Sequence, residues 1–412
     1  MSQAPPFIRN SITICRLNEH GLGVEAIDSE DATAEPAAQF TRRFRIYHLP
    51  GYILLQIWRF MCLALLLAVV AAIPVVQLAS LGYLLESAGR LAQSDGRKRP
   101  LPGLELAGKV GVFAALATLT WLPVWFVCDL SYSGQLLMPN TPSASRWRFA
   151  AFLVTVLWMI HVCWAALRGG RWWHYLWPAP IAFLKSFWRP ETWQKASHDL
   201  CALLIALEFP KLWWTGARGA LGALVWIALP ATMMIIGLRA IEFKPAVLVG
   251  LVGAVLLFFV ILYLPFLQIQ MAANNRWQEL FNVKSVRLRF RYAPWAHAMS
   301  LFAVCALSIP LYLLRIEATP SQLLWAPSLV FVLLLLPGKM LLGVAMGYGR
   351  KRQIRDLHPR HWVWRWLAML PMVVAVLFYM GALYVAQLVA SQGAPIMYFQ
   401  HLFLVPAPLI SS

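Results

Sequence analysis

The chain has 412 residues, of which 60% are hydrophobic and only 13% are charged. A soluble domain carries about 25% charged residues, so this composition excludes an ordinary soluble protein and predicts an integral membrane protein. The net charge is +18. Cytoplasmic loops of membrane proteins are enriched in Lys and Arg, and no nucleic-acid recognition fold fits between the apolar runs. We therefore expect the lipid bilayer, and no nucleic acid, as a partner.

The N-terminal segment differs from the rest of the chain. Residues 1–40 hold six carboxylates and two arginines, a net charge of −4. The segment is polar and rich in Ala, Pro and Ser, which is typical of disorder, and it lacks the apolar core of a signal peptide. We predict a disordered acidic cytoplasmic tail over residues 1–45. A transmembrane helical domain over residues 46–395 and a short C-terminal tail over residues 396–412 follow.

The first apolar segment, residues 52–92, is about twice as long as the ~20 residues that one span needs. Pro74 lies at its centre and is expected to break or kink a helix. We predict two helices, residues 55–73 and 75–92, that fold into a hairpin. One kinked span with the N-terminus outside is the alternative. The motif Pro74-Val-Val-Gln77 favours this alternative, since it recurs as Pro265-Phe-Leu-Gln268 at the inward end of a later run.

Seven further runs are long and apolar enough to cross a bilayer: residues 108–128, 148–167, 218–238, 246–267, 294–314, 323–346 and 366–390. We therefore predict an all-α fold, a polytopic transmembrane helical bundle with about eight spans, or nine if residues 55–92 form a hairpin. Glycines at 216, 219 and 222, and at 343 and 347, place small residues on one helix face. This spacing predicts close packing between helices.

The connections between the runs alternate between rich and poor in Lys and Arg. The rich connections are residues 90–109, 168–218, 268–293 and 347–365, and the poor ones are 129–147, 239–245, 315–322 and the segment after 390. The positive-inside rule places the rich connections in the cytoplasm. It predicts a cell inner membrane protein with a cytoplasmic N-terminus and its C-terminus outside.

The connection over residues 168–217 has an unusual composition. Its first part reads "RGGRWWHYLWPAPIAFLKSFWRPETWQK", and its apolar runs are too short to span. Tryptophan favours the headgroup level, and cations there attract anionic phosphates. We predict interfacial helices and lipid-interface residues that meet anionic lipid headgroups: Trp172, Trp173, Trp177, Lys185, Trp188 and Arg189.

Catalytic and metal-binding motifs are missing from the sequence. The five runs from 218 to 390 contain no Asp or Glu, whereas ion coupling usually uses an intramembrane carboxylate. We therefore expect no cofactor, no metal and no catalytic residue. A membrane-embedded lipid enzyme is disfavoured, since no acid–base or metal-ligating set converges.

Two polar features remain as candidate sites. The segment "QIQMAANNRWQE" follows an apolar run, and Gln268, Gln270, Asn274 and Asn275 are predicted to line a polar cytoplasmic vestibule. A helix end that emerges into water is the alternative. Lys339 lies within the run over residues 323–346, where its ammonium has to reach the interface or find a partner.

The segments "IPVVQLASLGYLLESAGRLAQ" and "PSLVFVLLLLPGKMLLGVAMGYGRKR" carry a family resemblance. Through Pro74, Gly82-Tyr83-Leu84, Gly89-Arg90 and an apolar run that ends at a proline, the chain resembles uncharacterised bacterial multi-pass proteins with a membrane domain of unknown function. The resemblance covers about the first and last thirds and implies no activity. We predict a structural or interaction component with membrane protein partners. An uncoupled transporter or channel for a small solute is the alternative.

Overall fold

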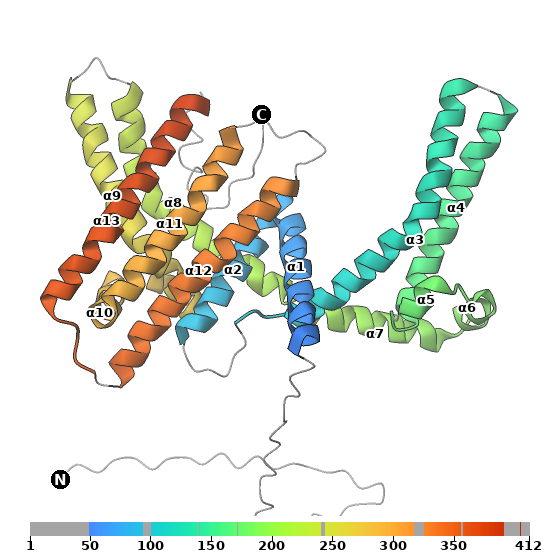
Figure 1. The fold of residues 1–412 in the computed structure, drawn as a ribbon, viewed down its shortest axis with the longest axis horizontal. Helices are drawn as coiled ribbons and strands as arrows, with labels where there is room; N and C mark the ends of the chain where they lie inside the picture. The colour runs from blue at the N-terminus through green and yellow to red at the C-terminus, as the bar shows by residue number, and fades with distance from the viewer. Residues whose placement is uncertain are drawn as a thin grey trace, which may run out of the picture. The chain divides into compact units, whose positions relative to one another are not determined.

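The computed structural model describes residues 49–93, 100–139, 141–170, 172–239, 244–316, 325–355, 357–390 and residue 404. This part of the chain is helical and contains no β-strand (Figure 1). By their contacts, the described residues from Ile53 onward belong to one compact unit. The tail predicted over residues 1–45 lies outside the described residues, as does the tail over 396–412 apart from Leu404.

Eight of the described helices are long and apolar enough to cross a membrane, which confirms the predicted all-α polytopic fold. They are α1 (Leu49–Ala72), α3 (Leu104–Leu137), α4 (Pro142–Leu167), α8 (Phe209–Arg239), α9 (Lys244–Asn274), α11 (Pro294–Ile316), α12 (Trp325–Ile354) and α13 (Trp362–Ala390). The shorter helices are α2 (Gln77–Gln93), α5 (Trp172–Leu176), α6 (Pro180–Phe187), α7 (Pro190–Ala206), the 3-10 helix η2 (Trp277–Phe281) and α10 (Val283–Tyr292).

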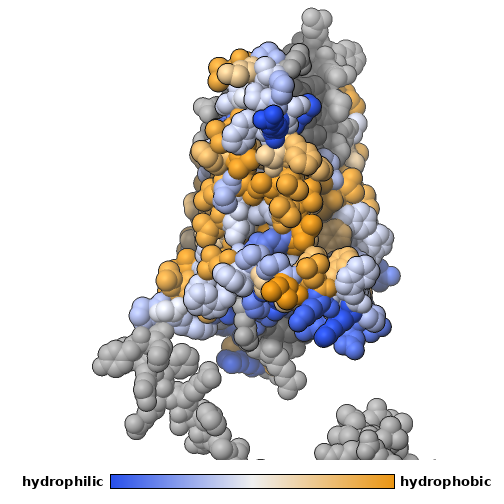
Figure 2. All heavy atoms as spheres, turned by 90° about the vertical axis from the view of Figure 1, so that its right-hand side faces the viewer, coloured by the Kyte–Doolittle hydropathy of each residue, from blue (hydrophilic) through white to orange (hydrophobic). Residues whose placement is uncertain are grey.

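The long helices carry large apolar side chains on their outer surfaces. Trp125 and Phe126 on α3 are each 58% exposed, and Phe149 on α4 is 68% exposed. Figure 2 shows an apolar band across one face, with hydrophilic residues gathered toward its ends, most densely at the lower end. Exposed apolar surface of this extent is rare in soluble monomers and matches the hydrocarbon layer of a bilayer.

Residues 55–92 form two helices, α1 and α2, with a tight turn at Pro74. Val75 in this turn has a φ of 69°, a left-handed conformation that a β-branched residue rarely adopts. The carbonyl of Pro74 accepts a hydrogen bond from the amide of Val76 at 2.8 Å. The indole of Trp213 on α8 donates to the carbonyl of Val75 at 2.9 Å. These hydrogen bonds stabilise the turn and offset the strain of the left-handed conformation at Val75. The break in the helix predicted at Pro74 is therefore present.

Helices α1 and α3 run in the same direction where they touch. A Cβ atom on Gly108 would meet the side chain of Arg59, and one on Gly111 would meet that of Cys62. The chain therefore has to return between these two helices, and α2 lies between them in the sequence. Its 17 residues extend about 26 Å, close to the ~30 Å of the hydrocarbon core. This geometry supports the hairpin rather than the single kinked span.

Helix α2 is not among the eight apolar spans because it is shorter and more polar than they are, and other helices surround it. It packs against α8, α9 and α12, and most of its residues are buried, Ser80 and Ser87 among them. Its charges pair within the protein, with Arg90 Nε 2.9 Å from Glu86 Oε1. A helix shielded by protein can hold paired polar groups at membrane depth, so these contacts are compatible with the predicted hairpin.

Glycines bring the backbones of α2, α8 and α12 into direct contact. A Cβ atom on Gly82 would lie 1.8 Å from the carbonyl oxygen of Leu212, and one on Gly216 would lie 1.7 Å from that of Leu78. On α12, a Cβ atom on Gly343 would lie 2.3 Å from the carbonyl oxygen of Ala88. The close packing predicted from the glycine spacing is confirmed at these crossings.

Candidate functional site

The polar segment at the end of α9 divides into a buried half and an exposed half. Gln268 and Gln270 are 0% and 1% exposed, whereas Asn274 and Asn275 are exposed. The helix ends here because Asn275 has a φ of 52°, a left-handed conformation that asparagine tolerates and that commonly terminates helices. The structure therefore places the four predicted vestibule residues in two different environments.

Gln268 is the partner of Lys339. Lys339 on α12 is 0% exposed, and its Nζ donates a hydrogen bond to Gln268 Oε1 at 2.9 Å. The amide of Gln268 donates in turn to the carbonyl of Gly219 on α8 at 3.1 Å and to that of Leu404 at 2.9 Å. One side chain thus joins α9 to α8, to α12 and to the segment after α13. The ammonium of Lys339 was expected either to reach the interface or to find a partner, and the structure shows the partner.

Gln270 faces a second polar cluster, which centres on the carboxylate of Glu279 in η2. The amides of Gln270, Asn274 and Asn282 all donate to this carboxylate, the latter two at 3.0 and 3.1 Å. Ser285 donates its hydroxyl to Gln270 Oε1. Burial by itself would raise the pKa of Glu279, but the three amide donors and the charge of Arg289 outweigh it and hold this pKa below its usual range. The cluster thus contains an ionised carboxylate.

The Glu279 cluster fixes the fold of the segment that follows α9. Arg218 on α8 donates to the backbone carbonyl of Asn275 at 3.3 Å and to its side-chain oxygen. The indole of Trp226, also on α8, donates to the carbonyl of Leu280 at 3.2 Å. Arg218 and Trp226 thus tie the segment after α9 to α8.

The residues predicted at the lipid interface are all exposed. Trp172 and Trp173 on α5 stack at a ring distance of 3.5 Å and are 50% and 61% exposed, while Trp177 and Trp188 reach 72% and 81%. Lys185 on α6 and Arg189, just before α7, are exposed as well. Exposure of indoles and cations on short helices is consistent with a headgroup layer. The connection is shorter than predicted, because α8 begins at Phe209 rather than after residue 217.

Hydrogen bonds to backbone carbonyls hold α5 against the end of α4. His161 Nε2 lies 2.7 Å from the carbonyl oxygen of Tyr175. The Arg168 guanidinium donates to the carbonyls of His174 and Trp177 at 2.8 and 2.7 Å. One ring nitrogen of His161 is therefore paired with a backbone carbonyl that joins α5 to α4.

Sequence reasoning missed the central role of Glu279. The signal that could have found it is the run of amide side chains around it in "QIQMAANNRWQELFN", of which Gln270, Asn274 and Asn282 are its donors. Sequence reasoning also left out His297 on α11, which is 1% exposed and whose Nδ1 lies 2.8 Å from the carbonyl oxygen of Ala293. Among the described residues, no group of three or more His, Cys, Asp or Glu could hold a metal ion.

Comparisons with known proteins do not assign the chain to a family. No protein-family model, curated protein or solved structure matches the chain. The resemblance to uncharacterised bacterial multi-pass proteins stays a prediction, and what is shown is a multi-pass membrane protein with an internally paired polar core.

Proposed function

We propose that the protein is a structural or interaction component of a cell inner membrane, which works by assembling with other membrane proteins. The observation that carries this proposal is the burial of Gln268 and Gln270. These amides are the polar groups best placed to line a solute path, and both are used in hydrogen bonds to Lys339, Glu279 and Ser285. A polar group that is already paired inside the bundle stabilises the helix arrangement instead of replacing the hydration of a solute.

A second observation concerns the apolar surface of α3 and α4. In α3 only 6% of the most apolar 18-residue window is buried within the chain, compared with 56% for α12. Helices in membranes associate by packing and hydrogen bonding rather than by the hydrophobic effect, so a span with so little intramolecular packing is free to pack against another chain. This surface supports an interaction role over a self-contained transport unit.

Extraction from native membranes into polymer-bounded lipid discs tests the interaction role. We expect discs that contain the 46.5 kDa chain together with a second membrane polypeptide or a second copy in fixed stoichiometry. Mass photometry and gel analysis of the same discs measure this. Discs that hold one copy of this chain alone, at its native expression level, contradict the proposal and favour the uncoupled transporter or channel.

The orientation in the membrane is part of the same proposal. With the cation-rich connections in the cytoplasm, the N-terminus is cytoplasmic and the C-terminus lies outside. A reporter that is active only outside the cytoplasm should be active after Ser412 and inactive before Met1, and a fluorescent protein that folds only in the cytoplasm should show the reverse. A fluorescent C-terminal fusion contradicts this topology.

A further inference from the structure

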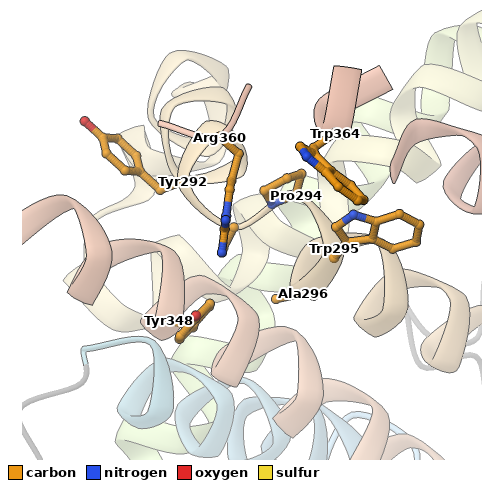
Figure 3. A pocket seen from close by; sticks show the side chains of 8 residues that line it. Tyr292, Pro294, Trp295, Ala296, Tyr348, Arg360 and Trp364 are labelled. Atoms are coloured by element: carbon orange, nitrogen blue, oxygen red, sulfur yellow. The ribbon is translucent and has the colours of Figure 1, made fainter. Parts of the chain in front are cut away.

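A cavity lies where α10, α11, α12 and α13 meet, at the ends of these helices. Its volume is about 340 Å³, within the roughly 300–1,000 Å³ of small-molecule sites. Eight residues line it: Tyr292, Ala293, Pro294, Trp295, Ala296, Tyr348, Arg360 and Trp364. Figure 3 shows the side chain of Arg360 extending into the space between Tyr292 and the two neighbouring indoles of Trp295 and Trp364. The cavity thus combines an apolar aromatic wall with one cation.

Backbone contacts hold Arg360 at the cavity. The Arg360 amide donates to the carbonyl of Arg291, in the last turn of α10, at 3.0 Å. A second cation lies close by, since the Arg352 guanidinium carbon is 5.9 Å from the ring centre of Tyr348, which lines the cavity. The cationic side of the site is therefore built by two segments of the chain, the end of α12 and the connection that follows it.

Positive charge around the cavity is not balanced by acids. Residues 283–292 and 347–355 contain Lys284, Arg287, Arg289, Arg291, Arg350, Lys351, Arg352 and Arg355. Neither segment holds an acid; the nearest in sequence are Glu279, Glu317 and Asp356. Burial first, and then the charge of Arg350, lower the pKa of Arg289, and Glu279 offsets this only in part. An added anion would relieve this repulsion.

The position of the cavity favours a lipid over a soluble ligand. Trp295 and Trp364 lie in the first turns of two membrane-spanning helices. Their side chains are 40% and 51% exposed, and exposed tryptophan prefers the headgroup region of a bilayer. Apolar walls suit the glycerol and the first carbons of an acyl chain, while Arg360 suits a phosphate.

We propose that this cavity binds the phosphate headgroup of an anionic phospholipid, with Arg360 as the phosphate ligand and the indoles of Trp295 and Trp364 beside the glycerol. This site is separate from the exposed tryptophans of α5–α7 and does not depend on the proposed assembly function. It would fix the depth of α11 and α13 in the leaflet where both helices begin.

Native mass spectrometry of the purified full-length chain, titrated with phosphatidylglycerol or phosphatidylcholine, tests the proposal. We expect a phosphatidylglycerol adduct whose dissociation constant rises about fivefold or more in Arg360→Gln, the effect of one cation near an anionic phosphate. Ala296→Phe fills the cavity at unchanged charge and should weaken binding similarly. Arg355→Gln, which removes the same charge outside the cavity lining, should weaken binding much less than Arg360→Gln does.

The remaining outcomes overturn the proposal. Equal binding of phosphatidylcholine shows that the phospholipid charge is not recognised. Displacement of phosphatidylglycerol by millimolar inorganic phosphate, at an ionic strength held constant with chloride, shows a site for free phosphate. Equal losses of phosphatidylglycerol affinity in Arg355→Gln and Arg360→Gln show that the positive charge of the whole region, and not the cavity, attracts the lipid. Melting temperatures of all variants, measured without added lipid, establish that a loss of binding is not a loss of fold.

Discussion

Replacement of Gln268 by leucine is expected to destabilise the bundle by about 2–3 kcal/mol, because it removes a buried acceptor from the amine of Lys339. It also removes the donor that reaches the carbonyls of Gly219 and Leu404. The free energy of unfolding, measured by denaturant titration in detergent micelles, should fall accordingly. Gln135→Leu makes the same chemical change at an exposed site on α3 and should have little effect.

The double variant Gln268→Leu/Lys339→Met separates the loss of this pair from general damage. Replacing both partners of a buried polar pair by apolar groups of similar shape is often nearly neutral. We therefore expect the double variant to recover most of the stability that Gln268→Leu loses. A double variant less stable than Gln268→Leu would show that the amine of Lys339 stabilises the fold without this partner, and would contradict the account of the pair.

The substitution Gly216→Ala is expected to have the largest effect at the helix crossings. The added methyl group would lie 1.7 Å from the carbonyl oxygen of Leu78, a backbone atom that cannot rotate away. Relief requires separation of α2 from α8, and overpacking of this kind costs about 1–3 kcal/mol or more. We expect a lower free energy of unfolding and faster proteolysis in the turn that joins α1 to α2.

Gly381→Ala is the matched control for this prediction. Gly381 lies within α13, and a Cβ atom there would meet nothing within 4 Å. Since alanine is favoured over glycine within a helix by about 1 kcal/mol, the same substitution should leave the protein as stable or more stable. Equal effects at positions 216 and 381 would contradict the close crossing of α2 and α8.

The sequence predicts the long spans well because lipid-facing helices have to be apolar along their whole length. It predicts the limits of α8 less well, placing its start near residue 218 instead of at Phe209. The first turns of α8 contact α2 and hold Lys211, which lies 2.7 Å from Glu208 and 3.6 Å from Glu86. The nearer of these ion pairs is local in the sequence, whereas the other joins helices far apart in the chain.

The polar core was harder to predict for the same physical reason. Hydropathy marks Lys339 and Gln268 as unusual, but they lie 71 positions apart and meet only because α9 and α12 pack together. The sequence identified all four polar residues at the end of α9, but it could not show which of them are buried and which are exposed. That difference depends on η2, which folds back and places Glu279 beside Gln270. Whether Asn274 and Asn275, which are exposed, face a vestibule stays a prediction.

The central claim is that the polar residues of this bundle hold helices together and do not carry a solute. The sequences of α8, α9, α11, α12 and α13 contain no Asp or Glu. These helices therefore offer no carboxylate that could bind a driving proton or sodium ion.

Purified protein in sealed liposomes tests this claim most directly, by light scattering after an osmotic shift with small neutral solutes and by uptake of labelled solutes under an imposed pH or sodium gradient. We predict permeability equal to that of protein-free liposomes and no accumulation. Solute entry above that level, reduced by Gln268→Leu or Gln270→Leu but not by Gln135→Leu, would contradict the claim and identify the protein as a transporter or channel.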